Sequence, residues 1–132
     1  MSVQGEVVRG SIVWLKLLLK VGNEQAGYRA AIVLSDGFIR SFSNSRLAFI
    51  VPVTTKAKNT PFEVSAPTGA DAIPLHGGLA DHPEISVLEG VALPDHAKSV
   101  DLSARNAIVI GRADPDSAFY IQVADYVKAI LA

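Results

Sequence analysis

The sequence predicts a mainly β (α+β) fold, in which a small, strongly curled antiparallel sheet or barrel carries one C-terminal helix. Short apolar runs rich in β-branched and aromatic residues follow one another up to residue 65, separated by turn residues. The spacing of apolar residues changes to that of a helix only from residue 114 onward. The chain has 132 residues, of which 49% are hydrophobic and 19% are charged. We therefore expect a single domain over 1–132 with one core.

The first half of the chain contains four predicted strands. "EVVRGSIVWLKLL" (6–18), "RAAIVLS" (29–35) and "RLAFIVPVT" (46–54) are apolar runs of the kind that buried strands have. The polar stretch 36–45 reads as the loop between the last two of these runs. A fourth strand, "PFEVS" (61–65), begins at a proline, where the missing N–H does no harm.

The second half begins with a segment of different composition. Residues 66–89 contain three prolines and three glycines, which predicts a long surface loop, with an edge strand near 85–88. Strand character returns in 90–101 and 106–113. The C-terminal segment 114–132 predicts a helix packed on the sheet, with Asp114 as N-cap and Pro115 at its first position. On this helix the core-facing positions would be Phe119, Val123, Tyr126, Val127 and Ile130, and the water-facing positions Gln122, Asp125 and Lys128.

Composition excludes several classes of protein. The chain has no cysteine, which excludes disulfides, thiolate catalysis and Cys-based zinc sites. The N-terminus lacks a signal-peptide pattern, and the apolar run 12–20 is too short for a membrane span, which needs about 20 residues. We expect a cytoplasmic protein with no membrane association. Residues 1–60 carry eight Lys and Arg against three Asp and Glu, whereas residues 61–105 carry two against seven. The basic first half could face a phosphate backbone.

Two polar clusters are candidates for chemistry on a phosphate. Arg29 follows a glycine-containing turn, and its guanidinium could hold a phosphate through two parallel N–H donors. Glu24, across that turn, could orient Arg29 or exchange a proton, although an exposed Glu–Arg pair is the commoner explanation. In "PVTTKAK" (52–58), two threonines end an apolar strand, where a hydroxyl can donate to a phosphate oxygen or a 2′-OH. A simple strand end with turn-forming hydroxyls would look the same.

The histidines suggest a weaker alternative. The predicted surface loop contains possible metal ligands, namely His76, Asp81, His82 and Glu84. Their spacing matches no helical or hairpin ligand motif, so ordinary loop residues are the better explanation. His96 could act as a general acid or base, but exposure at a strand end explains it more simply.

The order of these motifs resembles that of the MazF/PemK family of toxin endoribonucleases from type II toxin–antitoxin systems. "RGSIVWL" (9–15) is similar to the family's first strand, and "GNEQAGYRAAIVLS" (22–35) to its signature turn and second strand. "VPVTTKAKNTPFEV" (51–64) is similar to the third strand and its hairpin, and "GVALPDHAKSVDLSAR" (90–105) to a later family stretch. The C-terminal helix also agrees.

This resemblance implies a curled sheet of SH3-like barrel type, usually in a homodimer, and a sequence-specific endoribonuclease that cuts single-stranded RNA without a metal or cofactor. The 2′-OH would attack the adjacent phosphate, giving a 2′,3′-cyclic phosphate and a 5′-OH. Arg29 would stabilise the phosphorane and could protonate the leaving oxygen, Thr54 would hold the phosphate or 2′-OH, and Glu24 would orient Arg29 or act as base. The expected RNA contacts are Lys20, Gln25, Thr55, Lys56 and Lys58.

The resemblance also implies a partner and a biological role. A toxin of this kind arrests growth by cutting RNA, and an antitoxin with an acidic tail neutralises it in the same basic groove. The chain departs from the family pattern at Ser11, at Leu15 to Lys20, at Ala30 and in the length of 66–89. The alternatives are a non-catalytic binding protein on the same fold, such as a gyrase poison or a degenerate toxin, and a metal-dependent hydrolase using residues 76–84.

Overall fold

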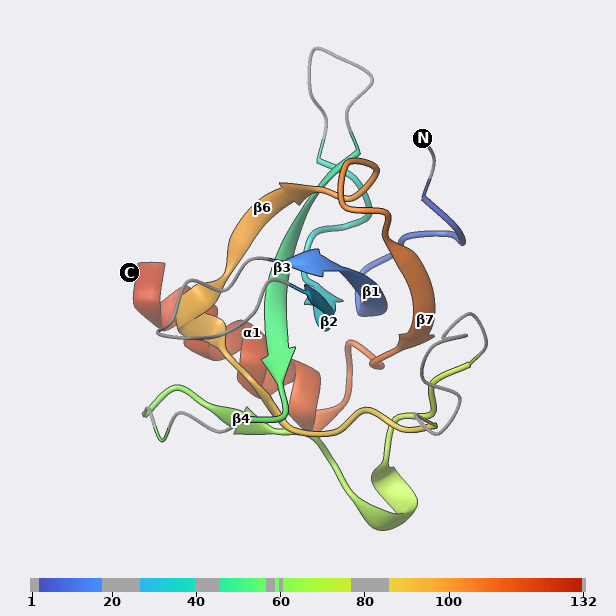
Figure 1. The fold of residues 1–132 in the computed structure, drawn as a ribbon. Coiled ribbons are helices and arrows are strands. Elements are labelled where there is room, and N and C mark those ends of the chain that lie inside the picture. Colours follow the sequence, from blue (N-terminus) through green and yellow to red (C-terminus); the bar gives the residue numbers. More distant parts are fainter. Residues whose placement is uncertain are drawn as a thin grey trace.

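The computed structural model describes residues 3–17, 27–39, 46–56, 59, 61–76 and 86–131, and these form a curled antiparallel sheet with one helix (Figure 1). The strands are β1 (Ser11–Leu17), β2 (Gly27–Val33), β3 (Leu47–Thr54), β4 (Val64–Ser65), β5 (Val91–Ala92), β6 (Lys98–Asp101) and β7 (Ile108–Arg112). The helical segments are the short 3₁₀ turns η1 (Gly69–Asp71) and η2 (Pro94–His96) and the helix α1 (Ala118–Leu131).

The strand order is β4-β5-β3-β2-β1-β7, and β6 pairs with a second part of β3. β3 is the longest strand and pairs with β2 on one side and with β5 and β6 on the other. Within the described residues the sheet runs from β4 to β7 without closing. The prediction of a curled antiparallel sheet is confirmed. The sequence allowed either a sheet or a closed barrel, and the described strands form an open sheet.

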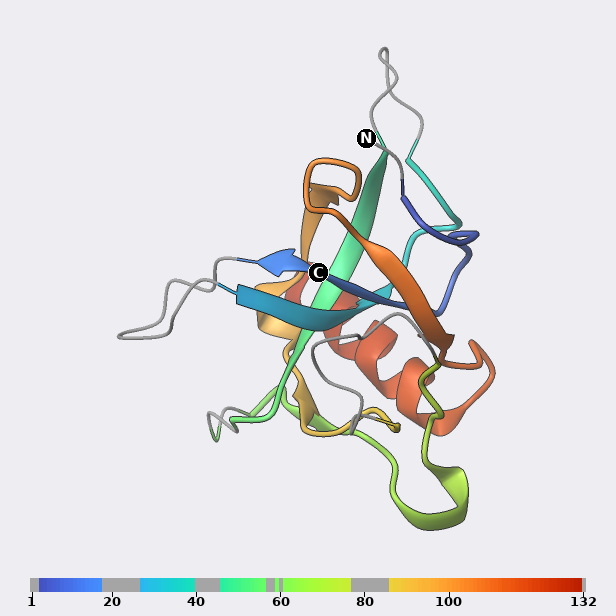
Figure 2. The same ribbon diagram turned by 45° about the vertical axis from the view of Figure 1, so that its right-hand side comes forward.

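Two apolar clusters cover the two faces of the central strands. Ile12 and Ile32 belong to the cluster beneath α1, which receives Val123 from the helix, whereas Val13 and Leu15 belong to the cluster on the opposite face. Figure 2 shows α1 lying against one face of the sheet. Burial on both faces explains why the central strands read as continuous apolar runs and not as alternating ones.

The helix begins later than its sequence predicts. It starts at Ala118, and the Oγ of Ser117 accepts a hydrogen bond from the N–H of Tyr120 at 3.3 Å. Asp114 caps the preceding turn instead, because its Oδ1 accepts from the N–H of Asp116 at 2.9 Å. The prediction that Ile130 packs on the sheet is also wrong, since this residue is 41% exposed. Within the described residues, no helix has the length and apolar character that crossing a membrane requires.

The segment predicted as a surface loop is packed into the molecule at both of its described ends. Ala66, Ile73 and Leu88 are buried in the cluster beneath α1. Residues 72–76 and 86–89, here called the arm, are joined by hydrogen bonds from Leu75 N to Ser86 O (2.8 Å) and from Leu88 N to Ile73 O (2.9 Å). The prediction that the whole of 66–89 is a surface loop is therefore wrong. Single apolar residues between prolines and glycines have no period that would reveal their burial.

Candidate active site

The pairing of β2 with β3 ends at Ala30 and Val53, and a pocket opens at that end of the sheet. Beyond this pair, β2 continues to Gly27 along β1, while β3 continues to Thr54 along β5. The pocket has a volume of about 140 Å³. Its lining residues are Trp14, Tyr28, Arg29, Ala30, Val53, Thr55, Leu75, Val87, Leu88 and Glu89. Strands β1 to β3 thus supply one wall and the arm supplies the other.

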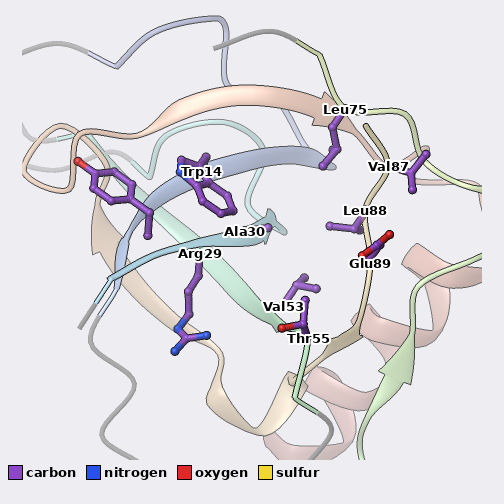
Figure 3. A pocket seen from close by; sticks show the side chains of 10 residues that line it. Trp14, Arg29, Ala30, Val53, Thr55, Leu75, Val87, Leu88 and Glu89 are labelled. Carbon is purple, nitrogen blue, oxygen red and sulfur yellow. The ribbon is translucent and has the colours of Figure 1, made fainter. Parts of the chain in front are cut away.

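Two aromatic residues form the wall on β1 and β2. Trp14 lies opposite Ala30 in the strand register, which makes Tyr28 its diagonal neighbour. The two rings stack with centroids 6.5 Å apart and an interplanar angle of 18°. In Figure 3, Trp14, Leu75 and Leu88 point into the space between β2 and the arm. The small side chain of Ala30 also lines this space.

Arg29 supplies the positive charge at this pocket. Its side chain is half-buried, with a buried Nε atom, and in Figure 3 it extends from β2 on the same side of the pocket as Thr55. A guanidinium in this position stays charged at any physiological pH and offers donors in a planar fork that suits phosphate. The predicted role of Arg29 in phosphate binding is compatible with this placement.

The two adjacent threonines have different surroundings. Thr54 is 2% exposed, and its Oγ1 accepts a hydrogen bond from the N–H of Lys56 at 3.1 Å. Thr55 is exposed and lines the pocket, and Lys56 is exposed beyond it. The hydrogen bond to Thr54 uses a lone pair of the hydroxyl oxygen, not its hydrogen, so Thr54 keeps its capacity to donate. The sequence does not indicate which of the two threonines is buried, and the structure shows that it is Thr54.

Gly90 fixes the position of this strand end. It adopts φ +98°, and a Cβ atom placed on it would lie 2.1 Å from the carbonyl oxygen of Thr54. No side chain fits there without displacing the backbone of Thr54. Gly90 also accepts a hydrogen bond through its carbonyl from the N–H of Ala66 at 2.9 Å, which connects the strand end to β4.

Several predicted site residues cannot be placed. Glu24, Gln25, Lys20 and Lys58 lie outside the described residues, as do three of the four possible metal ligands, Asp81, His82 and Glu84. The remaining ligand, His76, is exposed on the arm. His96 belongs to η2, with its Nε2 3.8 Å from a carboxylate oxygen of Asp95. In the described part of the chain, no three His, Asp or Glu residues are grouped as a metal site requires.

The apolar wall of the pocket could not be predicted from the sequence. Trp14 lies within the apolar run 6–18, yet it is half-buried and lines the pocket. Leu75 and Leu88 were assigned to a surface loop. The aromatic pair of Trp14 and Tyr28 becomes recognisable once the strand register, which makes the two residues diagonal neighbours, is known.

Comparison with known proteins identifies the family. Residues 8–131 match the PemK-like, MazF-like toxins of type II toxin–antitoxin systems. The chain is 34% identical to the endoribonuclease toxin MazF of Escherichia coli strain K12 over 107 residues, which cover 81% of this chain and 79% of that protein.

Solved structures agree with this match. The crystal structure of a MazE–MazF complex from Deinococcus radiodurans contains a chain with TM-score 0.64 and 29% identity, and the match covers 97% of both chains. MazF alone from the same organism gives TM-score 0.64 and 28% identity, covering 97% of this chain and 98% of that one. The chain therefore belongs to the PemK-like, MazF-like family of toxins from type II toxin–antitoxin systems.

Proposed function

We propose that this protein is a metal-independent endoribonuclease that cuts single-stranded RNA at the pocket between β2 and the arm. The observation that carries this proposal is the placement of Arg29 and Thr55 at one aromatic-walled pocket, with the buried Thr54 next to Thr55 in the chain. A cation, hydroxyl donors and an aromatic surface are the groups that bind a phosphate, a ribose and an unstacked base. The similarity to a protein named endoribonuclease toxin MazF supports the same activity.

The proposed reaction transfers the phosphate within the RNA strand. The 2′-oxygen loses its proton and attacks the adjacent phosphorus, and the bond to the 5′-oxygen breaks. The products are a 2′,3′-cyclic phosphate and a 5′-oxygen that takes up a proton to become a 5′-OH. Arg29 stabilises the extra negative charge on the phosphorane, and the hydroxyl of Thr54 donates to a phosphoryl oxygen or to the 2′-oxygen. Glu24 either removes the 2′-OH proton or orients Arg29, and both roles stay open.

The remaining RNA contacts follow the basic first half of the sequence. Thr55 and Lys56 lie next to the pocket, and Lys20, Gln25 and Lys58 are proposed to extend the contact along the RNA backbone. Contacts from lysine to phosphate weaken with salt, so RNA affinity should fall steeply as ionic strength rises. We propose that the protein acts on RNA in the cytoplasm.

The proposed partners are an antitoxin and a second copy of this chain. A MazE–MazF complex has been solved for the Deinococcus radiodurans relative, which supports a cognate antitoxin for this toxin. An acidic antitoxin segment would compete with RNA for the cationic groups at the pocket. Homodimerisation is part of the proposal through the family resemblance, and light scattering of the purified protein measures it.

Replacing Arg29 tests the nuclease proposal. Wild-type protein in EDTA should cleave a long single-stranded RNA to fragments with cyclic phosphate and 5′-OH ends. Arg29→Ala should lower kcat about 10²- to 10³-fold, because the transition state loses its main cation. Arg29→Lys keeps the charge but not the planar fork, so it should recover part of the rate. If wild-type protein cuts no RNA, or if cutting requires a divalent metal, the proposal is wrong.

A second experiment separates the two threonines. Thr54→Val preserves shape but removes the hydroxyl, so kcat should fall, while Thr54→Ser should keep most of the activity. Thr55→Val should mainly raise KM, by about 5-fold for one lost hydrogen bond of ~1 kcal/mol. A fall in kcat for Thr55→Val, with Thr54→Val fully active, would assign the catalytic hydroxyl to Thr55 instead.

A further inference from the structure

The pocket has the dimensions and chemistry of a site for one small aromatic ring. We propose that it binds the pyrimidine base next to the cleaved phosphate, and that Trp14 and the arm make it selective against purines. This proposal rests on the proposed RNA substrate, and it names which base that substrate presents to this pocket.

Volume is the first argument for a single-ring base. The pocket measures about 140 Å³. An engineered protein cavity of about 150 Å³ is known to take up one benzene molecule. A pyrimidine is a ring of that size, whereas the fused rings of a purine need more room. Because the pocket is partly open to solvent, its selectivity against purines depends on the position of the wall opposite Trp14.

The aromatic wall is the second argument. Unpaired RNA bases are bound in proteins by stacking on aromatic side chains, which contributes about 1–3 kcal/mol per base. Trp14 lines the pocket and stacks on Tyr28, and the phenol oxygen of Tyr28 accepts a hydrogen bond from Nδ2 of Asn106 at 3.4 Å. Tyr28 lines the same pocket, so the two rings together present one aromatic surface to a ligand. Aromatic side chains lose little conformational freedom when they stack a base.

The arm is the third argument, because it fixes the width of the pocket. Leu75 and Leu88 form the wall opposite Trp14 (Figure 3). Their backbone is tied across the arm by the Leu75–Ser86 and Leu88–Ile73 hydrogen bonds, and to β7 by a bond from His76 N to Ile110 O at 2.7 Å. Gly111 of β7 touches the arm so closely that an added Cβ would lie 2.9 Å from the carbonyl oxygen of Pro74. A wall anchored in this way does not move back to admit a larger base.

The polar side chains that line the pocket are those of Tyr28, Arg29, Thr55 and Glu89, and two of them, Arg29 and Thr55, place the reacting phosphate beside it. Arg29 and Thr55 lie together at one side of the pocket, so a base seated against Trp14 keeps its own phosphate near the guanidinium. The hydroxyl of Thr55 can both donate and accept, and it therefore suits cytosine and uracil alike.

Tryptophan fluorescence tests the proposal directly, because Trp14 is the single tryptophan of the chain. The probes are short oligodeoxynucleotides of cytosine, of thymine and of adenine, which lack the 2′-OH and cannot be cleaved. Both pyrimidine probes should quench Trp14 and bind with a Kd about 10-fold lower than the adenine probe, the size of discrimination that a tight apolar pocket gives. An open aromatic surface would bind adenine at least as well, and that result overturns the proposal.

Variants of the arm change the pocket width in both directions. Leu75→Ala should widen the pocket and bring adenine binding to within about 3-fold of cytosine binding, and Leu75→Phe should fill it and remove the quenching. Val87→Ala is a second widening variant if Leu75→Ala does not fold. The matched controls are Ile39→Ala and Ile39→Phe, since Ile39 is an exposed aliphatic residue that does not line the pocket. Unchanged base preference in both widening variants would refute the size argument.

RNA cleavage then distinguishes this proposal from the proposed function. Cleavage sites mapped on a long RNA should show a pyrimidine at one fixed position beside the cut, and widening variants should admit purines there. Cleavage without any such preference refutes the base pocket but leaves the nuclease intact. Pyrimidine-selective quenching without any cleavage refutes the nuclease but leaves the base pocket intact.

Discussion

The centre of the sheet and the end of the β2–β3 pair use the same strands for different purposes. At the centre, β1, β2 and β3 pair continuously, and Ile32 and Ile50 have no exposed surface. Past the pair of Ala30 and Val53, β2 keeps β1 as its neighbour and β3 keeps β5, and Arg29 and Thr55 lie beside a pocket. The site therefore lies where the β2–β3 pairing stops, because polar side chains there can reach a ligand without interrupting the core.

This separation predicts that stability and activity respond to different residues. A cavity in the centre should lower the free energy of unfolding without changing the chemistry of the remaining folded protein. A change at the strand end should alter activity, and it should alter stability only where the backbone itself is displaced.

The largest expected effect on stability is that of Ile32→Ala at the centre. Ile32 is 0% exposed within the cluster beneath α1. Losing its side chain should lower the free energy of unfolding by about 2–5 kcal/mol, because a cavity remains where packed atoms were. Urea unfolding followed by circular dichroism measures this loss. The kcat for RNA cleavage, corrected for the folded fraction, should stay within about 2-fold of wild type. A large fall in kcat would show that the two regions are not independent.

Gly90→Ala should lower both stability and activity, because it displaces the backbone at the end of β3. The added Cβ would lie 2.1 Å from the oxygen of Thr54, and alanine is strained at φ +98°. We expect a loss of about 3 kcal/mol in stability together with a fall in kcat, since Thr54 must shift.

The matched control for Gly90→Ala is Gly69→Ala, at φ +64° with no atom within 4 Å of the added Cβ. This variant has the strain without the clash, so it should lose only about 1 kcal/mol and keep its kcat. Equal losses in the two variants would show that the contact with Thr54 contributes nothing.

The same comparison explains which parts of the structure could be predicted from sequence. The central strands are buried on both faces, so "SIVWL" and "AAIVL" are mainly apolar runs that can be recognised as strands from the sequence. The residues of the strand end carry a different signal, because Arg29 and the two threonines stand out as polar groups beside apolar strands. Their order along the chain, together with the hairpin "PFEV", was sufficient to predict the family and to locate the end of β3.

The rest depends on register and on distant contacts. That Thr54 is buried and Thr55 lines the pocket follows from the pairing of β3 with β5, which involves residues far apart in sequence. The wall made by Leu75 and Leu88 depends on hydrogen bonds across the arm. Isolated leucines among prolines give no pattern from which these hydrogen bonds could be predicted. The helix start was misplaced because Asp114 and Ser117 are both good cap residues, and only the backbone geometry selects the second.

The smallest expected effect on stability concerns Tyr120, a residue of α1 that is buried in the cluster between the helix and the sheet. Burial raises the pKa of Tyr120 above its ordinary value of about 10, and the nearby Arg9 partly opposes this. The unfolded chain therefore releases the phenol proton at a lower pH than the folded chain. Stability from this group is complete below pH ~10 and is lost as pH rises from there through the raised pKa.

Tyr120→Phe removes the titrating hydroxyl and isolates its effect. The hydroxyl donates a long hydrogen bond to the carbonyl oxygen of Leu34 at 3.5 Å, so its loss should change stability at neutral pH by less than about 1 kcal/mol. Urea unfolding from pH ~8 to ~11 should show wild type losing more stability above pH ~10 than Tyr120→Phe does. Arg9→Gln should enlarge that difference, because it removes the charge that lowers the pKa. Identical pH profiles for wild type and Tyr120→Phe would mean that the phenol is hydrated in the folded protein, and that α1 covers this part of the centre less tightly than it covers Val123.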